Sequence, residues 1–120
     1  MVPFTKMHGA GNDFVVIDLR AHQLDLSANT FAVIADRHRG IGCDQIILIE
    51  PSQNGADVRF RFHNADGSEA GACGNGTRCA ASKVMDEDGT NKLSIETHSA
   101  ILSAKRAASG EITIDMGPAY

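Results

Sequence analysis

Residues 73–88 read CGNGTRCAASKVMDED, and this stretch decides how the rest of the chain is arranged. We predict a helix from Gly74 to about Asp88, roughly 22 Å long at 1.5 Å per residue. The flanks of this helix carry small side chains, among them Cys79 and Ala80. These small side chains indicate that other elements approach this helix closely from several sides.

Strand patterns lie on both sides of the helix. Residues 58–63 alternate apolar and polar side chains, which is typical of a half-exposed strand, whereas residues 14–17 are all apolar and fit a strand buried on both faces. A second helix is expected over residues 28–38, with Ser27 as its N-cap. The predominance of strands over the two predicted helices indicates an α+β fold with mainly antiparallel strands. The predicted strands are residues 4–8, 13–18, 45–50, 58–63, 92–97, 100–106 and 111–116.

The composition narrows the class of protein. At 120 residues the chain fits one domain, and 42% apolar with 22% charged residues is typical of a soluble globular protein. A net charge of −4 without a Lys/Arg cluster argues against a nucleic-acid partner. No apolar run approaches the roughly 20 residues of a membrane span, and the N-terminus lacks a signal peptide. Three cysteines without a Cys-x-x-Cys pair argue against disulfides and structural zinc, so we expect free thiols in the cytoplasm.

Cys73 is the candidate catalytic residue. The start of a helix leaves backbone N–H groups without partners and carries partial positive charge, which favours a thiolate. Gly74 and Asn75 would offer the same amides to a ligand carboxylate, since the glycine has no side chain to obstruct it. A buried structural thiol is the commoner fate of a lone cysteine. The neighbouring glycines and the exposed turn at residues 66–68 favour the functional interpretation.

Three side-chain amides are candidate substrate-binding groups. Asn12 follows a Gly-Ala-Gly turn that can aim its amide at a polar ligand, and Gln45 and Asn64 stand at strand ends. An amide offers a hydrogen-bond donor and an acceptor together. Taken singly, Gln45 and Asn64 are more simply explained by ordinary turn chemistry. Cys79 fits the core, Cys43 has no evident partner, and the histidines do not have the spacing of a metal site.

Taken together, the motifs resemble those of the diaminopimelate epimerase family. Residues 6–14, KMHGAGNDF, are similar to the family's first signature, and residues 36–45, DRHRGIGCDQ, to its second. Residues 64–70 leading into residues 73–79, CGNGTRC, are similar to its cysteine signature. The three motifs occur in order over most of the chain, so the match is specific. One departure is Cys43, where a larger apolar residue is usual.

The resemblance implies a cytoplasmic enzyme of lysine and peptidoglycan biosynthesis that interconverts LL- and meso-diaminopimelate without pyridoxal phosphate, metal or other cofactor. It implies that Cys73 is one of two thiols that exchange the α-proton from opposite faces. It also implies substrate contacts by Asn12, Gln45 and Asn64, and carboxylate binding by Gly74 and Asn75. The implied fold has antiparallel strands curled around a central helix.

The serious departure from the family is length. The family has two similar domains, and the motifs of the second domain, including its cysteine, are absent from residues 1–120. We therefore expect an N-terminal domain that is inactive without its second domain, and that self-associates, for example as a homodimer, or is poorly soluble. Two alternatives stay open: half of a proline-racemase-type isomerase, and a non-catalytic binding or interaction module. Asn75, where proline racemases usually carry histidine, favours diaminopimelate as the substrate.

Overall fold

The structure is a computed structural model that describes residues 4–9, 12–20, 34, 42–70, 74–98 and 100–115. Ile34 is helical, and the rest of the helix predicted over residues 28–38 lies outside the described residues. The other elements are β1 (Phe4–Gly9), β2 (Asn12–Asp18), β3 (Gln45–Glu50), β4 (Val58–Asn64), β5 (Glu69–Ala70), α2 (Gly74–Asp88), β6 (Lys92–Glu96), β7 (Ile101–Arg106) and β8 (Ile112–Asp115).

The strands form a single sheet in the order β1-β2-β3-β4-β6-β7-β8, with β5 paired to β4. Two neighbouring pairs are parallel, β2 with β3 and β4 with β6. The other pairs are antiparallel. The prediction of a mainly antiparallel sheet in an α+β fold is therefore confirmed.

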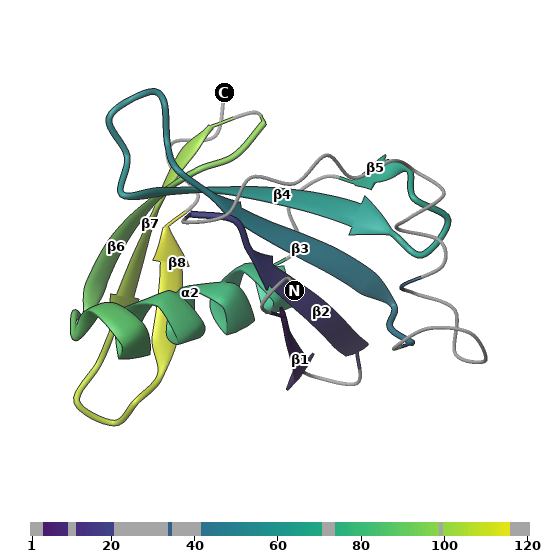
Figure 1. Cartoon of the computed structure of the whole chain (residues 1–120). Coiled ribbons are helices and arrows are strands. Elements are labelled where there is room, and N and C mark those ends of the chain that lie inside the picture. The colour runs from purple at the N-terminus through teal and green to yellow at the C-terminus, as the bar shows by residue number, and fades with distance from the viewer. Residues whose placement is uncertain are drawn as a thin grey trace.

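The sheet curls around α2. Both β1 and β8, which stand at opposite ends of the strand order, contact this helix, and so do β2, β3 and β6. Figure 1 shows α2 running below β4, crossing β8 toward one end and reaching β1 and β2 at the other. The predicted arrangement of strands curled around a central helix is confirmed, and so are the helix bounds.

The main core fills the space between the sheet and α2. The strands alternate side chains between two faces, and the inward positions of β2, β3, β4 and β6 are apolar. The helix contributes small or medium side chains, so the strands can approach it closely. The fully buried helix residues of this core are Ala80, Ala81, Val84 and Met85.

A second apolar cluster lies on the opposite face of β2 and β3. It contains Val15 and Ile17 from β2 and Ile46 and Leu48 from β3, with Ile34 packed against it. These two strands are therefore buried on both faces, which the run of apolar residues 14–17 predicts for β2. Cys43 is only 3% exposed and belongs to this cluster, which gives it a packing role.

The structure corrects two details of the predicted strands. His63 was expected on the half-exposed face of β4, but it is only 6% exposed, because β5 pairs with β4 there and the turn before β5 folds over the ring. Strands β6 and β7 are each one residue shorter than predicted, since the Thr97 amide bonds to the Ala100 carbonyl in a turn. Strand β5 was not predicted, and Met116 lies outside the described residues.

Within the part of the chain that the structure describes, no helix has the length and apolar character needed to cross a bilayer.

Candidate active site

The first turn of α2 forms one wall of the candidate site. The helix begins at Gly74, directly after Cys73, which itself lies outside the described residues. Gly76 packs against the sheet so closely that a Cβ there would lie 2.9 Å from Ile47 Cδ1 and 3.2 Å from Phe14 Cε1. The start of the helix is therefore held against β2 and β3, with its first backbone N–H groups at one end of the sheet.

Gln45 and Asn64 lie together at that same end of the sheet. They are opposite one another in the β3–β4 pairing, and Gln45 Nε2 is 3.5 Å from Asn64 Oδ1. Side chains two residues apart on a strand share a face. Gln45 therefore shares the helix-facing side of the sheet with Ile47, and Asn64 shares it with Phe62. The structure brings together these two predicted substrate-binding residues, beyond the apolar core.

The turn after β4 fixes the Asn64 amide. Asn64 Nδ2 donates to Ser68 Oγ at 3.2 Å, and the backbone N–H of Asn64 donates to the Ser68 carbonyl at 2.8 Å. Ser68 is held in turn by Asp66, whose Oδ1 accepts from the Ser68 hydroxyl at 2.6 Å and from its backbone N–H at 2.9 Å. These two hydrogen bonds lower the pKa of Asp66 below its usual value, so this carboxylate is ionised at neutral pH.

A reciprocal contact between Asp13 and Asp44 joins the beginnings of β2 and β3. The backbone N–H of Asp13 donates to Asp44 Oδ2 at 3.0 Å, and that of Asp44 donates to Asp13 Oδ1 at 2.9 Å. Lys6 Nζ lies 3.5 Å from Asp13 Oδ2 and offsets part of the negative charge. Asp44 directly precedes Gln45, so this contact fixes the backbone on which Gln45 stands.

The remaining predicted site residues are described only in part. Asn12 begins β2, where its backbone pairs with that of Gly9. Gly74 and Asn75 form the first positions of α2. The side chains of Asn12 and Asn75 lie outside what the structure describes, so their roles stay predictions. The role of Cys73 also stays a prediction.

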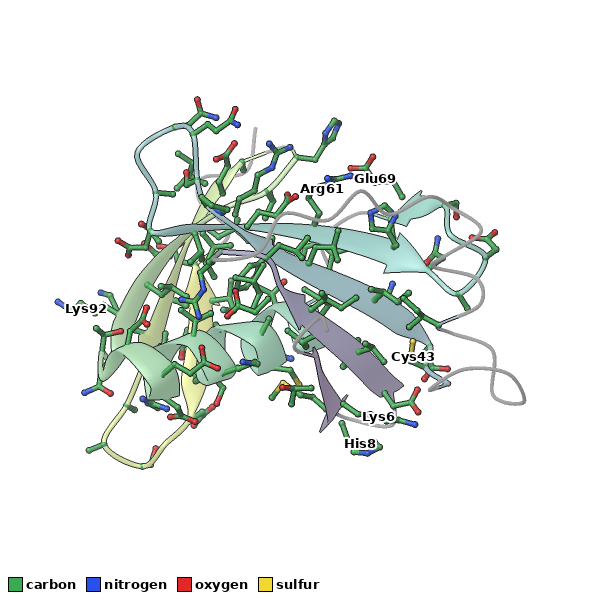
Figure 2. The ribbon with its side chains drawn as sticks, viewed as in Figure 1. Lys6, His8, Cys43, Arg61, Glu69 and Lys92 are labelled. Atoms are coloured by element: carbon green, nitrogen blue, oxygen red, sulfur yellow. The ribbon has the colours of Figure 1, made fainter. Side chains whose placement is uncertain are left out.

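Cys79 and His63 have structural surroundings. Cys79 is half-buried against the core, with its Sγ 3.7 Å from the His8 carbonyl oxygen, which agrees with the predicted core role. His63 Nδ1 lies 3.2 Å from the Gly67 carbonyl oxygen. Figure 2 shows His8 on β1 and Cys43 at the start of β3, well separated from one another. Among the described residues, no group of His, Cys, Asp and Glu side chains could hold a metal ion.

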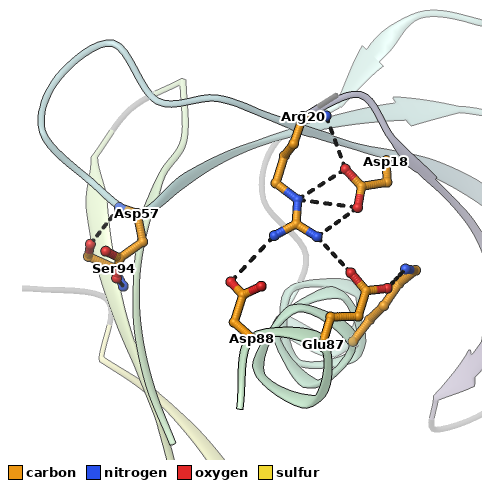
Figure 3. Close-up of polar contacts among 7 residues, drawn as sticks. Asp18, Arg20, Asp57, Glu87, Asp88 and Ser94 are labelled. Atoms are coloured by element: carbon orange, nitrogen blue, oxygen red, sulfur yellow. Dashed lines mark hydrogen bonds and ion pairs between the residues drawn. The ribbon is translucent and has the colours of Figure 1, made fainter. Parts of the chain in front are cut away.

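The far end of α2 is anchored by charged side chains. Arg20, just after β2, contacts Asp18 at 2.7 Å, Glu87 at 2.6 Å and Asp88 at 3.4 Å (Figure 3). Burial raises the pKa of Asp18, but the hydrogen bonds and charge of Arg20 outweigh it, so the net pKa is lowered. The hydrogen bonds that Arg20 donates to the Asp18 carboxylate raise the pKa of Arg20. The C-terminal end of the helix is thereby tied to the end of β2.

Sequence reasoning missed the supporting residues of the site. Asp66 and Ser68 were expected only to mark an exposed turn, and Asp13 was treated only as part of a motif. The available signal was local, because Asp, Gly and Ser shortly after a strand-end Asn can place a hydroxyl against its amide. The Asp13–Asp44 contact had no such signal, because it joins residues 31 positions apart.

The sheet curled around α2 defines a class of α+β domain that known structures share. One is a methylitaconate-delta-isomerase, which matches at a TM-score of 0.67 and 18% identity over 92% of this chain and 62% of that one. Another is a PhzF-family phenazine biosynthesis protein of Bacillus anthracis, at a TM-score of 0.61 and 24% identity over 92% of this chain and 37% of that one. At these identities the likeness concerns the fold alone.

The sequence matches are more specific. The sequence profile of the family described as diaminopimelate epimerase matches residues 4–120, and the chain belongs to this family. It is 56% identical over 115 residues to a diaminopimelate epimerase of Acidiphilium cryptum, covering 96% of this chain and 41% of that protein. The chain is 52% identical over 117 residues to a diaminopimelate epimerase of Rhodospirillum centenum, covering 97% of this chain and 40% of that protein. The chain thus spans about two fifths of the length of these relatives. The proline-racemase alternative is not favoured.

Proposed function

We propose that this chain is the N-terminal domain of a two-domain diaminopimelate epimerase, which interconverts LL- and meso-diaminopimelate in lysine and peptidoglycan biosynthesis. Membership of the family supports this proposal, and so does the 41% share of the Acidiphilium relative that the chain spans. The second domain is the partner that completes the site. We further propose that the enzyme is cytoplasmic, needs no cofactor, and forms a homodimer.

The observation that carries the proposal is the position of the helix start. Helix α2 begins at Gly74, one residue after Cys73, at the end of the sheet where Gln45 and Asn64 meet. A thiol there is next to unpaired backbone N–H donors, which favour its thiolate form and can bind a carboxylate. The amides of Gln45, Asn64 and Asn12 suit the far end of a substrate that carries an amino-acid group at both ends.

In the proposed reaction, the Cys73 sulfur and a second thiol act from opposite faces of the α-carbon. One thiolate takes the α-proton, and the C–H electron pair moves into the carbon and the adjacent carboxylate. The other thiol then returns a proton to the opposite face and becomes a thiolate, so the two thiols have exchanged protonation states. Gly74 and Asn75 would donate backbone N–H groups to the carboxylate as it gains charge. Removing one such donor typically costs roughly 3–4 kcal/mol of transition-state stabilisation.

The test is reconstitution of this chain with the second domain of a relative, for example that of Acidiphilium cryptum. Conversion of LL- to meso-diaminopimelate in deuterium oxide is followed by chromatography and mass spectrometry, without added cofactor. We expect no conversion by the chain alone and measurable conversion by the pair. Cys73→Ala in the pair should lower the rate by at least about a thousandfold if this thiol is a proton-transfer group.

The matched control is Cys79→Ala, which removes a thiol from the same helix and should leave the rate within about twofold, since Cys79 packs against the core. Full conversion by the chain alone would refute the requirement for two thiols on opposite faces of the α-carbon. A folded pair that converts proline but not diaminopimelate would refute the proposed substrate. Retention of activity in Cys73→Ala would refute the role of this thiol.

A further inference from the structure

The turn of residues 64–68 contains a chain of hydrogen bonds that ends at Gln45. Asp66 accepts from Ser68 Oγ at 2.6 Å, Ser68 Oγ accepts from Asn64 Nδ2 at 3.2 Å, and Asn64 Oδ1 lies 3.5 Å from Gln45 Nε2. We call this chain the amide relay; it consists of Asp66, Ser68, Asn64 and Gln45. The last contact is the longest, and it joins the two predicted substrate-binding residues.

The donor and acceptor atoms of these groups allow only one direction of hydrogen bonding along the amide relay. An ionised carboxylate can only accept, so the single hydroxyl proton of Ser68 is used toward Asp66. Toward Asn64 the same hydroxyl can then only accept, so Asn64 must present its NH2 group to Ser68. The oxygen of the Asn64 amide consequently faces Gln45, which must donate a hydrogen bond to it from its own NH2 group. This assignment follows from counting protons and does not depend on the choice between amide flips.

Backbone hydrogen bonds within the turn hold the residues of the amide relay in place. The Asn64 N–H donates to the Ser68 carbonyl at 2.8 Å, and the Gly67 N–H donates to the Asn64 carbonyl at 2.9 Å. Gly67 has φ of 90°, a conformation that glycine adopts without strain. Asp66 also accepts from the Ser68 backbone N–H, which holds the carboxylate beside the hydroxyl. The turn therefore positions the hydroxyl before any ligand arrives.

The geometry points to Asp66 and Ser68 as positioning residues that select the charge of the group bound beside Gln45. Because Gln45 uses its NH2 group toward Asn64, its Oε1 is directed away and is left to accept a hydrogen bond. The matching ligand group is a donor, which in a diamino-dicarboxylate is the distal ammonium. This inference rests on the proposed function and adds to it that Gln45 binds the distal amino group through an orientation that Ser68 imposes.

The test measures discrimination by the reconstituted two-domain protein. Two ligands are compared by calorimetry: LL-diaminopimelate, and the analogue in which one amino group is replaced by hydrogen. Without the Ser68 hydroxyl the Asn64 amide can turn over, and Gln45 can then present NH2 to the ammonium. We expect Ser68→Ala to weaken binding of diaminopimelate about tenfold, and to change binding of the analogue less than about twofold. In turnover, KM should rise with little change in kcat.

Ser68→Thr keeps the hydroxyl and should restore the preference for diaminopimelate. Asp66→Ala removes the acceptor that orients the hydroxyl and should reproduce the loss seen in Ser68→Ala. The matched control is Ser109→Ala, another exposed serine in a turn, which should leave both affinities unchanged. If Ser68 had a purely structural role, Ser68→Ala would weaken the binding of both ligands equally, and this result would overturn the inference. A wild-type pair that binds neither ligand would overturn the proposed function as well, whereas unchanged discrimination in Ser68→Ala overturns only the relay.

Discussion

The two ends of α2 are held in different ways. At the N-terminal end Gly76 has no side chain, and the helix backbone rests directly on Ile47 and Phe14. At the C-terminal end Arg20 bridges Asp18 of β2 to Glu87 and Asp88 of the helix. Close apolar contact fixes a position to within tenths of an ångström but requires a close fit, whereas ion pairs near the surface tolerate movement. The end that carries the candidate site is thus the end that is packed most tightly.

The largest effect is expected where the packing is tightest. Gly76→Ala places a methyl group 2.9 Å from Ile47 Cδ1, and both Ile47 and Phe14 are fully buried. Overpacking of this kind costs roughly 1–3 kcal/mol, which outweighs the helix propensity gained by alanine. We expect a loss of about 2 kcal/mol in the free energy of unfolding, measured by urea denaturation.

Two further variants sharpen this prediction. Ile47→Val deletes the Cδ1 atom that the new methyl group meets, so the double variant should be more stable than the sum of the two single effects. Gly89 is the control at the other end of the helix, because it has φ of 69° and a Cβ added there would meet nothing within 4 Å. Gly89→Asn should cost little, since Asn tolerates this conformation. Additive energies for Gly76→Ala and Ile47→Val would contradict the packing explanation.

A smaller effect is expected at the charged end. Arg20→Met removes the partner of Asp18, whose side chain is only 17% exposed, and should cost about 1 kcal/mol by urea denaturation. Arg61→Met is the control, because Arg61 makes a single 3.3 Å contact with Glu50 on the outer face of β4 (Figure 2). The control should cost less than about 0.5 kcal/mol. Equal losses in the two variants would show that the Arg20 contacts add no stability.

The smallest effect is a pH dependence at the charged end. The pKa of Asp18 is lowered in the folded state, so its contribution to stability is present above the unfolded pKa and is lost as pH falls through the folded pKa. The stability difference between the wild type and Arg20→Met should therefore be largest at neutral pH and shrink below about pH 4. Urea midpoints at pH 7, 5 and 3 measure it. A difference that stays constant over this range would contradict the role of the Asp18 charge.

Much of the fold followed from local patterns. The alternation in β4 reflects the two-residue repeat of a strand, the apolar run in β2 indicates burial on both faces, and the glycines mark the start of α2. Residues whose partners are distant could not be placed in this way. His63 was misplaced because β5 and its turn cover it, and the contacts of Arg20 join residues up to 68 positions apart. Such contacts depend on the path of the whole chain.

The sequence by itself determined the strands other than β5, the bounds of the central helix, the family, and the candidate residues Cys73, Asn12, Gln45 and Asn64. Local propensity and motif spacing suffice for these, because they depend on neighbours within a few residues. Only the tertiary structure decided that β2 and β3 run parallel, that Gln45 meets Asn64, and that Ser68 orients the Asn64 amide. The physical reason is that strand pairing sets which side chains face one another, and the direction of a hydrogen bond is fixed only once both partners are in place.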